Sequence, residues 1–249
     1  MRRGFTLIEA ILTVALISVL LFMLAPSLSR VRESARTTAN LSNLRQHVAI
    51  VSAYATDYSG LVPQLAEPTA TYSVIRCESQ GVALAVPYFA VTRYWHIGLA
   101  DGYYAGEWKG RSFHSPWIRE PGVQTSYVLS CTMMADPAFY NLSTRLDLPH
   151  QLRAARLDEV QFPSNKAMLA SAESYRTSTA RDTGYLAMRQ ATTDVGMVDG
   201  HAEHPKAESV VPQIHNGDGP FSVADYGGHM GALLPMTHTE RGVRGRDIK

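Results

Sequence analysis

An almost uninterrupted apolar run occupies residues 5–25, and Glu9 is the only charged residue among these 21 positions. At about 1.5 Å of rise per residue, a helix of this length covers roughly 30 Å, the thickness of a bilayer's hydrocarbon core. Arg2 and Arg3 precede the run and favour a cytoplasmic N-terminus. A secretory signal has a shorter apolar region followed by a small-residue cleavage site. The sequence therefore predicts a membrane-spanning helix, in which the carboxylate of Glu9 is costly unless another charge offsets it.

A second helical pattern follows the apolar run. Apolar residues recur there at steps of three and four, at Leu41, Leu44, Val48, Val51, Ala55 and Tyr58. This spacing places them on one face of an amphipathic helix that packs on a core. Pro26 is expected to kink or locally melt the helix, because proline removes one intrahelical hydrogen bond. Ser59, Gly60 and Pro63 end the pattern, so we predict one helix over residues 5–58, about 80 Å long.

Residues 60–249 have the size of one domain and change to short elements separated by turns. The hydrophobic content of 45% supports a core, and the net charge of +1 gives no overall field that would attract nucleic acid. Strands are predicted at 82–91 (limited by Pro87), 127–129, 166–170 and 196–198. A short helix or turn is predicted at 153–160, and 204–249 is predicted to be a long irregular tail over the sheet. The predicted fold class is α+β, a long N-terminal helix on a small antiparallel sheet.

The stretch Gly4-Phe5-Thr6-Leu7-Ile8-Glu9 resembles the processing motif of the type IV pilin and type II secretion pseudopilin superfamily. The resemblance covers about residues 1–60. Counted from Phe5, Glu9 is the fifth residue and Pro26 the twenty-second, and both are positions that the family shares. The resemblance implies that a membrane peptidase cuts after Gly4 and methylates the new terminal amine of Phe5. It also implies that Glu9 of one subunit pairs with the Phe5 amine of its neighbour during assembly.

The resemblance also implies a domain organisation and a function. It divides the chain into a leader (1–4), a transmembrane half of the helix (5–25), an amphipathic half (26–59) and an extracytoplasmic domain (60–249), the lollipop arrangement of pilins. The function would be that of a structural subunit of a type II secretion pseudopilus or a type IV pilus. Its partners would be prepilin peptidase, other pilin or pseudopilin subunits, the bacterial inner membrane and the secretion assembly platform. A generic single-pass anchor with a stray glutamate is the alternative.

A late element around Asp199-Gly200-His201 adds a second resemblance. Asp-Gly between two strand-like runs suits a type I′ hairpin turn. The element is similar to the strand–Asp-Gly-His–strand element of a large bacterial subfamily of prepilin-type proteins. Two landmarks of that subfamily are missing, because Arg189 replaces a histidine and Phe113-His114-Ser115-Pro116 lacks a cysteine.

The sequence carries no motif of a known catalytic site, so we predict that the domain is not an enzyme. There is no Gly-x-Ser-x-Gly elbow, no Walker loop, no Gly-x-Gly-x-x-Gly and no His-Glu-x-x-His. The chemically suggestive group near the hairpin consists of Asp199, His201, Glu203 and His204. On a strand the first three share one face and His204 points the other way, which disfavours a metal site.

No cofactor is predicted, and calcium is the alternative that the resemblance raises. Major pseudopilins often bind calcium in a C-terminal loop, and Asn216, Asp218 and Asp225 supply oxygen atoms in a Gly-rich segment. The segment lacks the closing carboxylate of an EF-hand spacing. Solvated loop residues are the other interpretation.

Cys77 and Cys131 are the two cysteines of the chain, and both follow the predicted membrane span. In an oxidising compartment such a pair favours a disulfide, which would close a long loop. Two buried free thiols are the alternative.

Two functions from other classes remain open. A DNA-uptake pilin would show a clustered basic or aromatic surface patch, although no nucleic-acid partner is predicted. A membrane-tethered hydrolase or carbohydrate-binding protein would show a deep pocket with converging acids and shifted pKa values.

Overall fold

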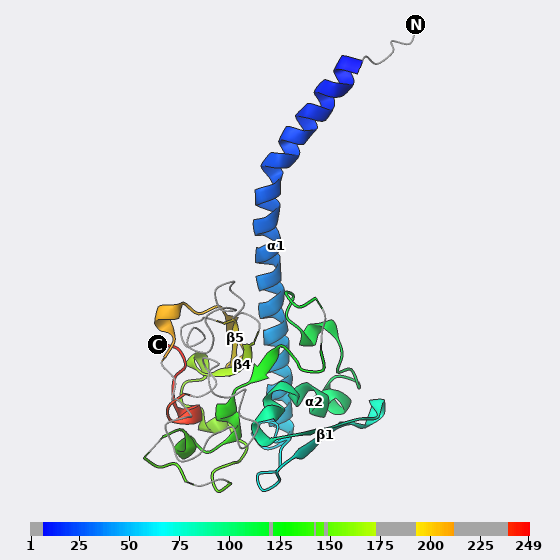
Figure 1. Cartoon of the computed structure of the whole chain (residues 1–249). Helices are drawn as coiled ribbons and strands as arrows, with labels where there is room; N and C mark the ends of the chain where they lie inside the picture. Colours follow the sequence, from blue (N-terminus) through cyan, green and yellow to red (C-terminus); the bar gives the residue numbers. More distant parts are fainter. Residues whose placement is uncertain (1–6, 120–121, 142, 147–148, 173–192, 212–238) are drawn as a thin grey trace. The chain divides into compact units, whose positions relative to one another are not determined.

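The computed structural model describes residues 7–119, 122–141, 143–146, 149–172, 193–211 and 239–249. The chain divides into two compact units, Met1–Ala39 and Asn40–Lys249. Helix α1 (Leu7–Asp57) contributes its first part to one unit and its second part to the other (Figure 1).

Helix α1 is 51 residues long, which corresponds to roughly 75 Å. Its backbone stays helical across Pro26, so the expected local melting does not occur. The helix ends where the sequence predicted, because Ser59 adopts a left-handed conformation (φ 55°) and the Gly60 N–H donates to the Ala55 carbonyl at 2.6 Å. This is the hydrogen bond of a Schellman C-cap.

A four-stranded antiparallel sheet forms the centre of the Asn40–Lys249 unit. Its strands, in spatial order, are β3 (Tyr127–Leu129), β4 (Ala167–Ser171), β5 (Val195–Met197) and β6 (Ala202–Glu203). The first three coincide with predicted strands to within one residue at each end. Every residue of these three is buried, which explains why their apolar runs are continuous rather than alternating.

A second, two-stranded antiparallel sheet pairs β1 (Ser73–Cys77) with β2 (Val82–Val86). Helix α2 (Trp95–Tyr103) lies beside β1. The predicted strand over 82–91 is therefore too long. Proline lacks the N–H that a ladder requires, so the strand ends before Pro87 and residues Tyr88–Arg93 form a 3₁₀ turn. Neither β1 nor α2 is among the elements that the sequence pattern predicts.

Short 3₁₀ turns occupy many of the connections. Besides Tyr88–Arg93 they are Glu78–Gln80, Arg111–Phe113, Cys131–Met134, Pro137–Tyr140, Leu157–Glu159, Pro163–Asn165, Ala207–Ser209 and Gly242–Arg244. The turn at Leu157–Glu159 lies within the segment predicted as a short helix or turn. The described parts of the predicted tail pair with each other through the β-bridge between Val210 and Ile248. They are held against the rest of the unit by bonds such as that from the Asp247 N–H to the Asn165 carbonyl, at 2.8 Å.

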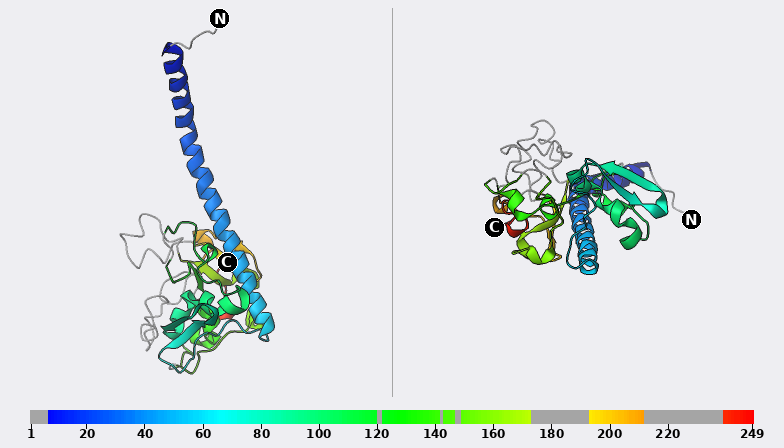
Figure 2. Two further views of the ribbon diagram at one scale, coloured as in Figure 1. Left: turned by 90° about the vertical axis from the view of Figure 1, so that its right-hand side faces the viewer. Right: turned by 90° about the horizontal axis from the view of Figure 1, so that it is seen from below.

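Residues 40–57 of α1 lie between the four-stranded sheet on one side and α2 with the β1–β2 hairpin on the other (Figures 1 and 2). The predicted stripe is confirmed at its centre, where Leu44, Val48 and Val51 are fully buried. They pack in one cluster with residues of α2, β3 and β4, including Trp95, Leu99, Tyr127, Leu129 and Leu169. Tyr58, the last residue of the predicted stripe, is instead half exposed and stacks on Tyr54.

The loop between β5 and β6 is a hairpin, as predicted, but its turn is not of type I′. Type I′ needs positive φ at both central residues, whereas here Gly200 has φ +96° and Asp199 does not have positive φ. The Gly200 N–H donates to the Met197 carbonyl at 3.0 Å, and the Met197 N–H donates to the His201 carbonyl at 2.8 Å. These bonds define a three-residue loop, a type I turn followed by a left-handed glycine.

Both cysteines are buried free thiols, so the predicted disulfide is absent and the alternative holds. Cys77 Sγ lies 3.4 Å from Asp101 Oδ1. Burial raises the pKa of Cys131 to about 12. Helix α1 and the two antiparallel sheets give an α+β fold with a long N-terminal helix, which is the predicted class.

Candidate functional site

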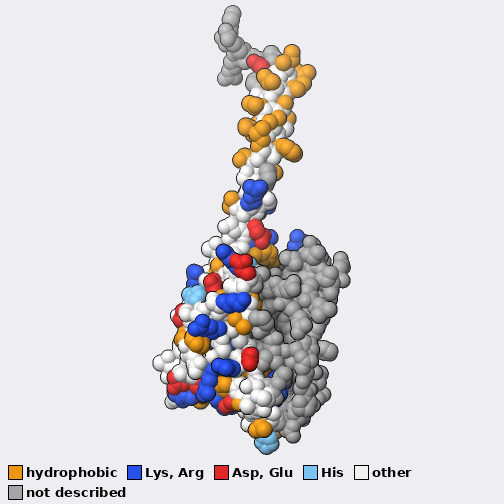
Figure 3. All heavy atoms as spheres, turned by 90° about the vertical axis from the view of Figure 1, so that its left-hand side faces the viewer, with side chains coloured by type: hydrophobic (Ala, Val, Ile, Leu, Met, Phe, Trp, Pro, Cys, Tyr) orange, Lys and Arg blue, Asp and Glu red, His pale blue; other side chains and the backbone are white. Residues whose placement is uncertain are grey.

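The first part of α1 carries apolar side chains that the Met1–Ala39 unit leaves exposed (Figure 3). They are Leu7, Ile8, Ile11, Leu12, Val14, Leu16, Ile17, Val19, Leu20, Leu21, Phe22, Met23 and Leu24, and each is more than half exposed. By length and composition α1 could cross a membrane, and the most apolar window has a mean hydropathy of 2.7. We call residues 7–25 the apolar segment.

The hydroxyl groups within the apolar segment are satisfied by the helix itself. Thr13 Oγ1 donates to the Ala10 carbonyl and Ser18 Oγ to the Val14 carbonyl, both at 2.8 Å. Such bonds remove the need for water, as a hydrocarbon environment requires. Glu9 is the single ionisable residue of the segment, and its side chain is exposed. It lies in the first turn of α1, where the helix dipole favours a negative charge by about 0.3–1 kcal/mol.

Charged residues begin again after the apolar segment, at Arg30, Arg32, Glu33 and Arg36, and all four are exposed. Together with Arg2 and Arg3 they give the apolar segment basic residues on both sides. The distribution of arginine alone therefore does not decide which end faces the cytoplasm.

Several predicted site residues lie outside the described part of the chain. They are the processing residues Gly4 and Phe5 and the calcium candidates Asn216, Asp218 and Asp225. Pro26 lies within α1, seventeen residues after Glu9 in the sequence.

The group near the hairpin does not converge on one point. His201 Nδ1 lies 2.5 Å from Asp199 Oδ1, whereas His204 Nδ1 lies 2.7 Å from a different carboxylate, Asp194 Oδ1. Among the described residues, no three His, Cys, Asp or Glu side chains are arranged to hold a metal ion.

His204 instead belongs to a polar network that the sequence analysis missed. Asn40 Nδ2 donates to Asp194 Oδ2 at 2.6 Å, and the Tyr127 hydroxyl donates to Asn40 Oδ1 at 2.8 Å. Asn43 Nδ2 donates in turn to the Tyr127 hydroxyl at 3.1 Å. The network joins α1, β3 and the residue before β5 inside the core, and it reaches the surface at His204, whose side chain is half exposed. The partners are far apart in sequence, so local pattern could not reveal them.

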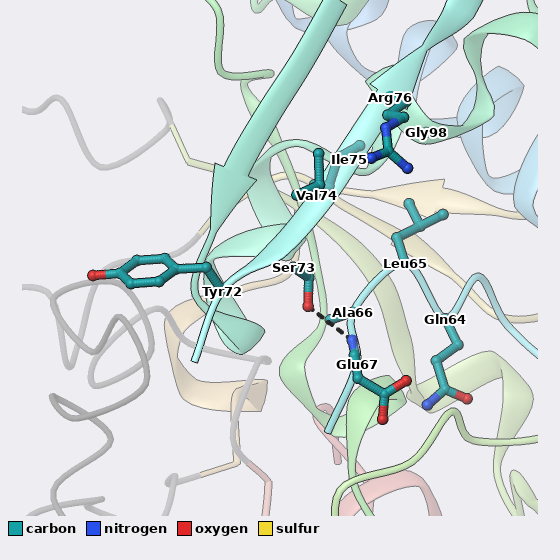
Figure 4. A pocket seen from close by; sticks show the side chains of 10 residues that line it. All are labelled: Gln64, Leu65, Ala66, Glu67, Tyr72, Ser73, Val74, Ile75, Arg76 and Gly98. Atoms are coloured by element: carbon teal, nitrogen blue, oxygen red, sulfur yellow. Dashed lines mark hydrogen bonds between the residues drawn. The ribbon is translucent and has the colours of Figure 1, made fainter. Parts of the chain in front are cut away.

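A groove of about 660 Å³ runs beside β1 (Figure 4). Ser73 Oγ accepts a hydrogen bond from the Glu67 N–H at 2.8 Å, and Tyr72 points away from the other labelled side chains. Glu67 is the one carboxylate in the lining and Arg76 the one cation. The groove therefore does not offer the converging acids that the alternative function, a membrane-tethered hydrolase, would need.

The histidines with strongly shifted pKa values lie inside the core. Burial lowers the pKa of His47 to about 4 and that of His96 to about 3, and neither residue lines the groove. These shifts follow from desolvation, as expected for core histidines held neutral.

Fold and site together define a class: an α+β domain whose N-terminal helix is long and apolar enough to span a membrane. Searches with this chain gave no match to a protein-family model, to a curated protein or to a solved structure. A narrower assignment therefore rests on the residues themselves.

Proposed function

We propose that this protein is a prepilin-like structural subunit, anchored in the bacterial inner membrane and polymerised through α1 into a type II secretion pseudopilus or a type IV pilus. One observation carries the proposal. The exposed apolar segment contains a single carboxylate, Glu9, and directly overlaps the motif Gly4-Phe5-Thr6-Leu7-Ile8-Glu9. A generic anchor has no need of a carboxylate at this depth, where it costs a few kcal/mol on insertion scales.

In the proposed pathway, prepilin peptidase cuts after Gly4 and methylates Phe5. The new amine at Phe5 is a positive charge that did not exist at that position in the precursor. Glu9 of a neighbouring subunit pairs with it, which offsets the cost of a carboxylate in an apolar environment. The remaining exposed apolar side chains of the segment pack against lipid before assembly and against other α1 helices afterwards.

The resemblance, rather than the arginine distribution, supports the proposed orientation. The leader would lie in the cytoplasm before cleavage, and the Asn40–Lys249 unit in the periplasm or outside the cell. The assembly platform of the secretion system would be the further partner.

Processing is tested first, with Gly4 replaced by a bulky residue. Gly4→Leu should leave the precursor uncut in the membrane fraction, with no filament. The mass of the purified protein shows both whether residues 1–4 have been removed and whether Phe5 carries a methyl group. A wild-type protein that keeps its leader in a host with an active prepilin peptidase would contradict the proposal.

Charge pairing is tested separately, with variants that leave cleavage intact. Glu9→Leu should be cleaved normally but give little filament, and Glu9→Asp should be intermediate because its side chain is shorter. Thr13→Val is the matched control, since it changes a polar residue of the same helix without changing charge. Filaments are measured by shearing and by cross-linking between subunits. Wild-type filament yield from Glu9→Leu would overturn the pairing account.

A further inference from the structure

A lysine and an aspartate are in direct contact inside the Asn40–Lys249 unit. Lys166 immediately precedes β4, and Asp247 lies in the C-terminal segment that runs alongside it. Both side chains are completely buried, and Lys166 Nζ lies 3.2 Å from Oδ1 and 3.1 Å from Oδ2 of Asp247. Because Nζ is almost equally far from the two oxygens, it lies close to the plane that bisects the O–C–O angle, and the carboxyl carbon lies in that plane. Because both oxygens are within 3.2 Å of Nζ, the amine nitrogen is also close to the carboxyl carbon, the atom that a nucleophile would attack.

Burial makes the uncharged forms of both groups accessible. Desolvation lowers the pKa of the Lys166 ammonium group and raises the pKa of the Asp247 carboxyl group. Transfer of one proton from the ammonium to the carboxylate leaves an amine and a carboxylic acid, so no charge has to be solvated in the interior. An uncharged amine is a nucleophile, whereas an ammonium is not.

Two neighbouring groups are placed to assist a reaction between them. Thr239 Oγ1 lies 3.0 Å from Lys166 Nζ and also donates a hydrogen bond to Asp247 Oδ1. One hydroxyl thus contacts both the atom that must lose a proton and the atom that must gain one. The Ala167 N–H donates to Asp247 Oδ2 at 2.8 Å, where negative charge develops when the amine adds to the carbon.

We propose that Lys166 and Asp247 condense to an intramolecular isopeptide bond. Lys166 Nζ attacks the Asp247 carboxyl carbon and forms the new N–C bond. Oδ1 already carries the carboxylic acid proton and receives one Nζ proton through the Thr239 hydroxyl. The bond from carbon to Oδ1 then breaks, and that oxygen leaves as water. Oδ2 becomes the amide oxygen and keeps its hydrogen bond from Ala167. The balance is one amine plus one acid giving one amide and one water, with no other reactant.

The surrounding backbone already holds the two residues in place. The Asp247 N–H donates to the Asn165 carbonyl at 2.8 Å, and the Lys249 N–H donates to the Ser209 carbonyl at 2.9 Å. The reacting groups thus need little movement, which is the condition under which proximity accelerates a condensation. The bond would close a covalent loop between β4 and the C-terminal segment. It does not depend on the function proposed above.

The test is a tryptic digest of the purified full-length protein after denaturation. Trypsin cuts after Lys and Arg, so an unlinked chain gives peptides 157–166 and 247–249. A linked chain gives instead peptide 157–176 joined to 247–249, lighter by one water than the two together, because an acylated Lys166 is not cut. We expect the branched peptide to account for most of Lys166. Complete cleavage at Lys166 with release of free 247–249 would show a lasting ion pair and overturn the proposal.

Variants assign the roles of the three side chains. Lys166→Arg keeps a cation but should give no branched peptide. Thr239→Val and Thr239→Ser form a matched pair, because both are close to threonine in size and only serine keeps the hydroxyl. At a fixed time after synthesis, the linked fraction should be at least tenfold lower in Thr239→Val than in Thr239→Ser. Equal linked fractions in the two variants would overturn the relay through Thr239.

Discussion

His47 lies on the buried face of α1, inside a group of aromatic rings. Its ring stacks on Phe113 with 5.1 Å between centroids and meets the edge of Trp95 at 5.5 Å. Its Nε2 donates to the Ser112 carbonyl at 2.8 Å, so in a neutral ring Nδ1 accepts from the Tyr104 hydroxyl, also at 2.8 Å. Protonation would remove that acceptor. The geometry and the lowered pKa therefore agree on an uncharged histidine.

We predict that the domain loses stability in acid because of its buried histidines. The pKa values of His47 (about 4) and His96 (about 3) lie below the value of 6.5 expected in the unfolded chain. Below pH 6.5 the unfolded state binds more protons than the folded state, so stability falls as the pH falls from 6.5 towards 4 and is fully present above 6.5. The loss from His47 alone should be on the order of 3 kcal/mol.

Denaturant unfolding at several pH values between 7.5 and 4 measures this dependence. His96→Phe removes one of the two titrating groups while keeping an aromatic ring, so its stability should depend less steeply on pH than that of the wild type. An identical slope in this variant would show that His96 does not contribute.

The two thiols give a second prediction at this scale. In the native, unreduced protein a thiol reagent at pH 8 should label neither cysteine rapidly, because both are buried and the raised pKa of Cys131 leaves almost no thiolate. After denaturation without reductant, two thiols per chain should react. Finding none would show that Cys77 and Cys131 form a disulfide in the cell.

Individual residues differ in how far the sequence reveals their role. Glu9 could be recognised because a charge in an apolar run contradicts its immediate surroundings. Lys166 and Asp247 could not, because a lone lysine and a lone aspartate are typical of a surface and their contact spans 81 positions. The hydrogen bond between Asn40 and Asp194 could not be predicted for the same reason, because the two residues are 154 positions apart in the sequence.

At the level of elements, the contact between α1 and β5 is unusually close at Gly196. A Cβ added there would lie 2.6 Å from Val48 Cγ2 and 3.4 Å from the Leu44 carbonyl oxygen. Glycine is thus required by the approach of the helix to the strand rather than by its backbone conformation, since Gly196 does not have positive φ.

We predict that Gly196→Ala destabilises the domain by about 1–3 kcal/mol, the usual cost of overpacking. In a Val48→Ala background the same change should cost clearly less, because the clashing methyl group is gone. Gly102→Ala on α2 is the control. Nothing lies within 4 Å of its added Cβ, so it should be neutral or slightly stabilising. Additive effects of Gly196→Ala and Val48→Ala would contradict the contact.

The elements that sequence pattern predicted are those with strong local signals. Helix α1 has a long apolar run and a regular stripe, and β3, β4 and β5 are apolar runs between turns. Strand β1 was missed because it is short and because its exposed residues are Val74 and Arg76. Exposed and buried positions alternate along it, but apolar and polar residues do not. Helix α2 contains two glycines and has no side-chain cap, so packing rather than propensity holds it.

For the whole molecule, we predict that membrane attachment and domain folding can be separated. Residues from Asn40 onward form a compact unit of their own. A fragment that begins at Arg30 should be soluble and should unfold at the same temperature as the domain in the full chain. The full chain should be extracted from membranes by detergent but not by high salt, because apolar burial does not respond to screening.

Fractionation and thermal unfolding measured by circular dichroism test both halves of this prediction. Release of the full chain by salt alone would contradict a spanning helix. A fragment that fails to fold would show that the apolar segment contributes to the domain.

The network of Asn40, Tyr127 and Asp194 also has an evolutionary consequence. Each member leaves a buried polar partner unsatisfied when it is lost alone, which costs about 1–3 kcal/mol, whereas joint replacement by apolar residues can be nearly neutral. Selection should therefore act on the three positions as a group. In homologous chains they should co-vary, with the amide on the helix, the phenol on β3 and the carboxylate before β5 kept or lost together.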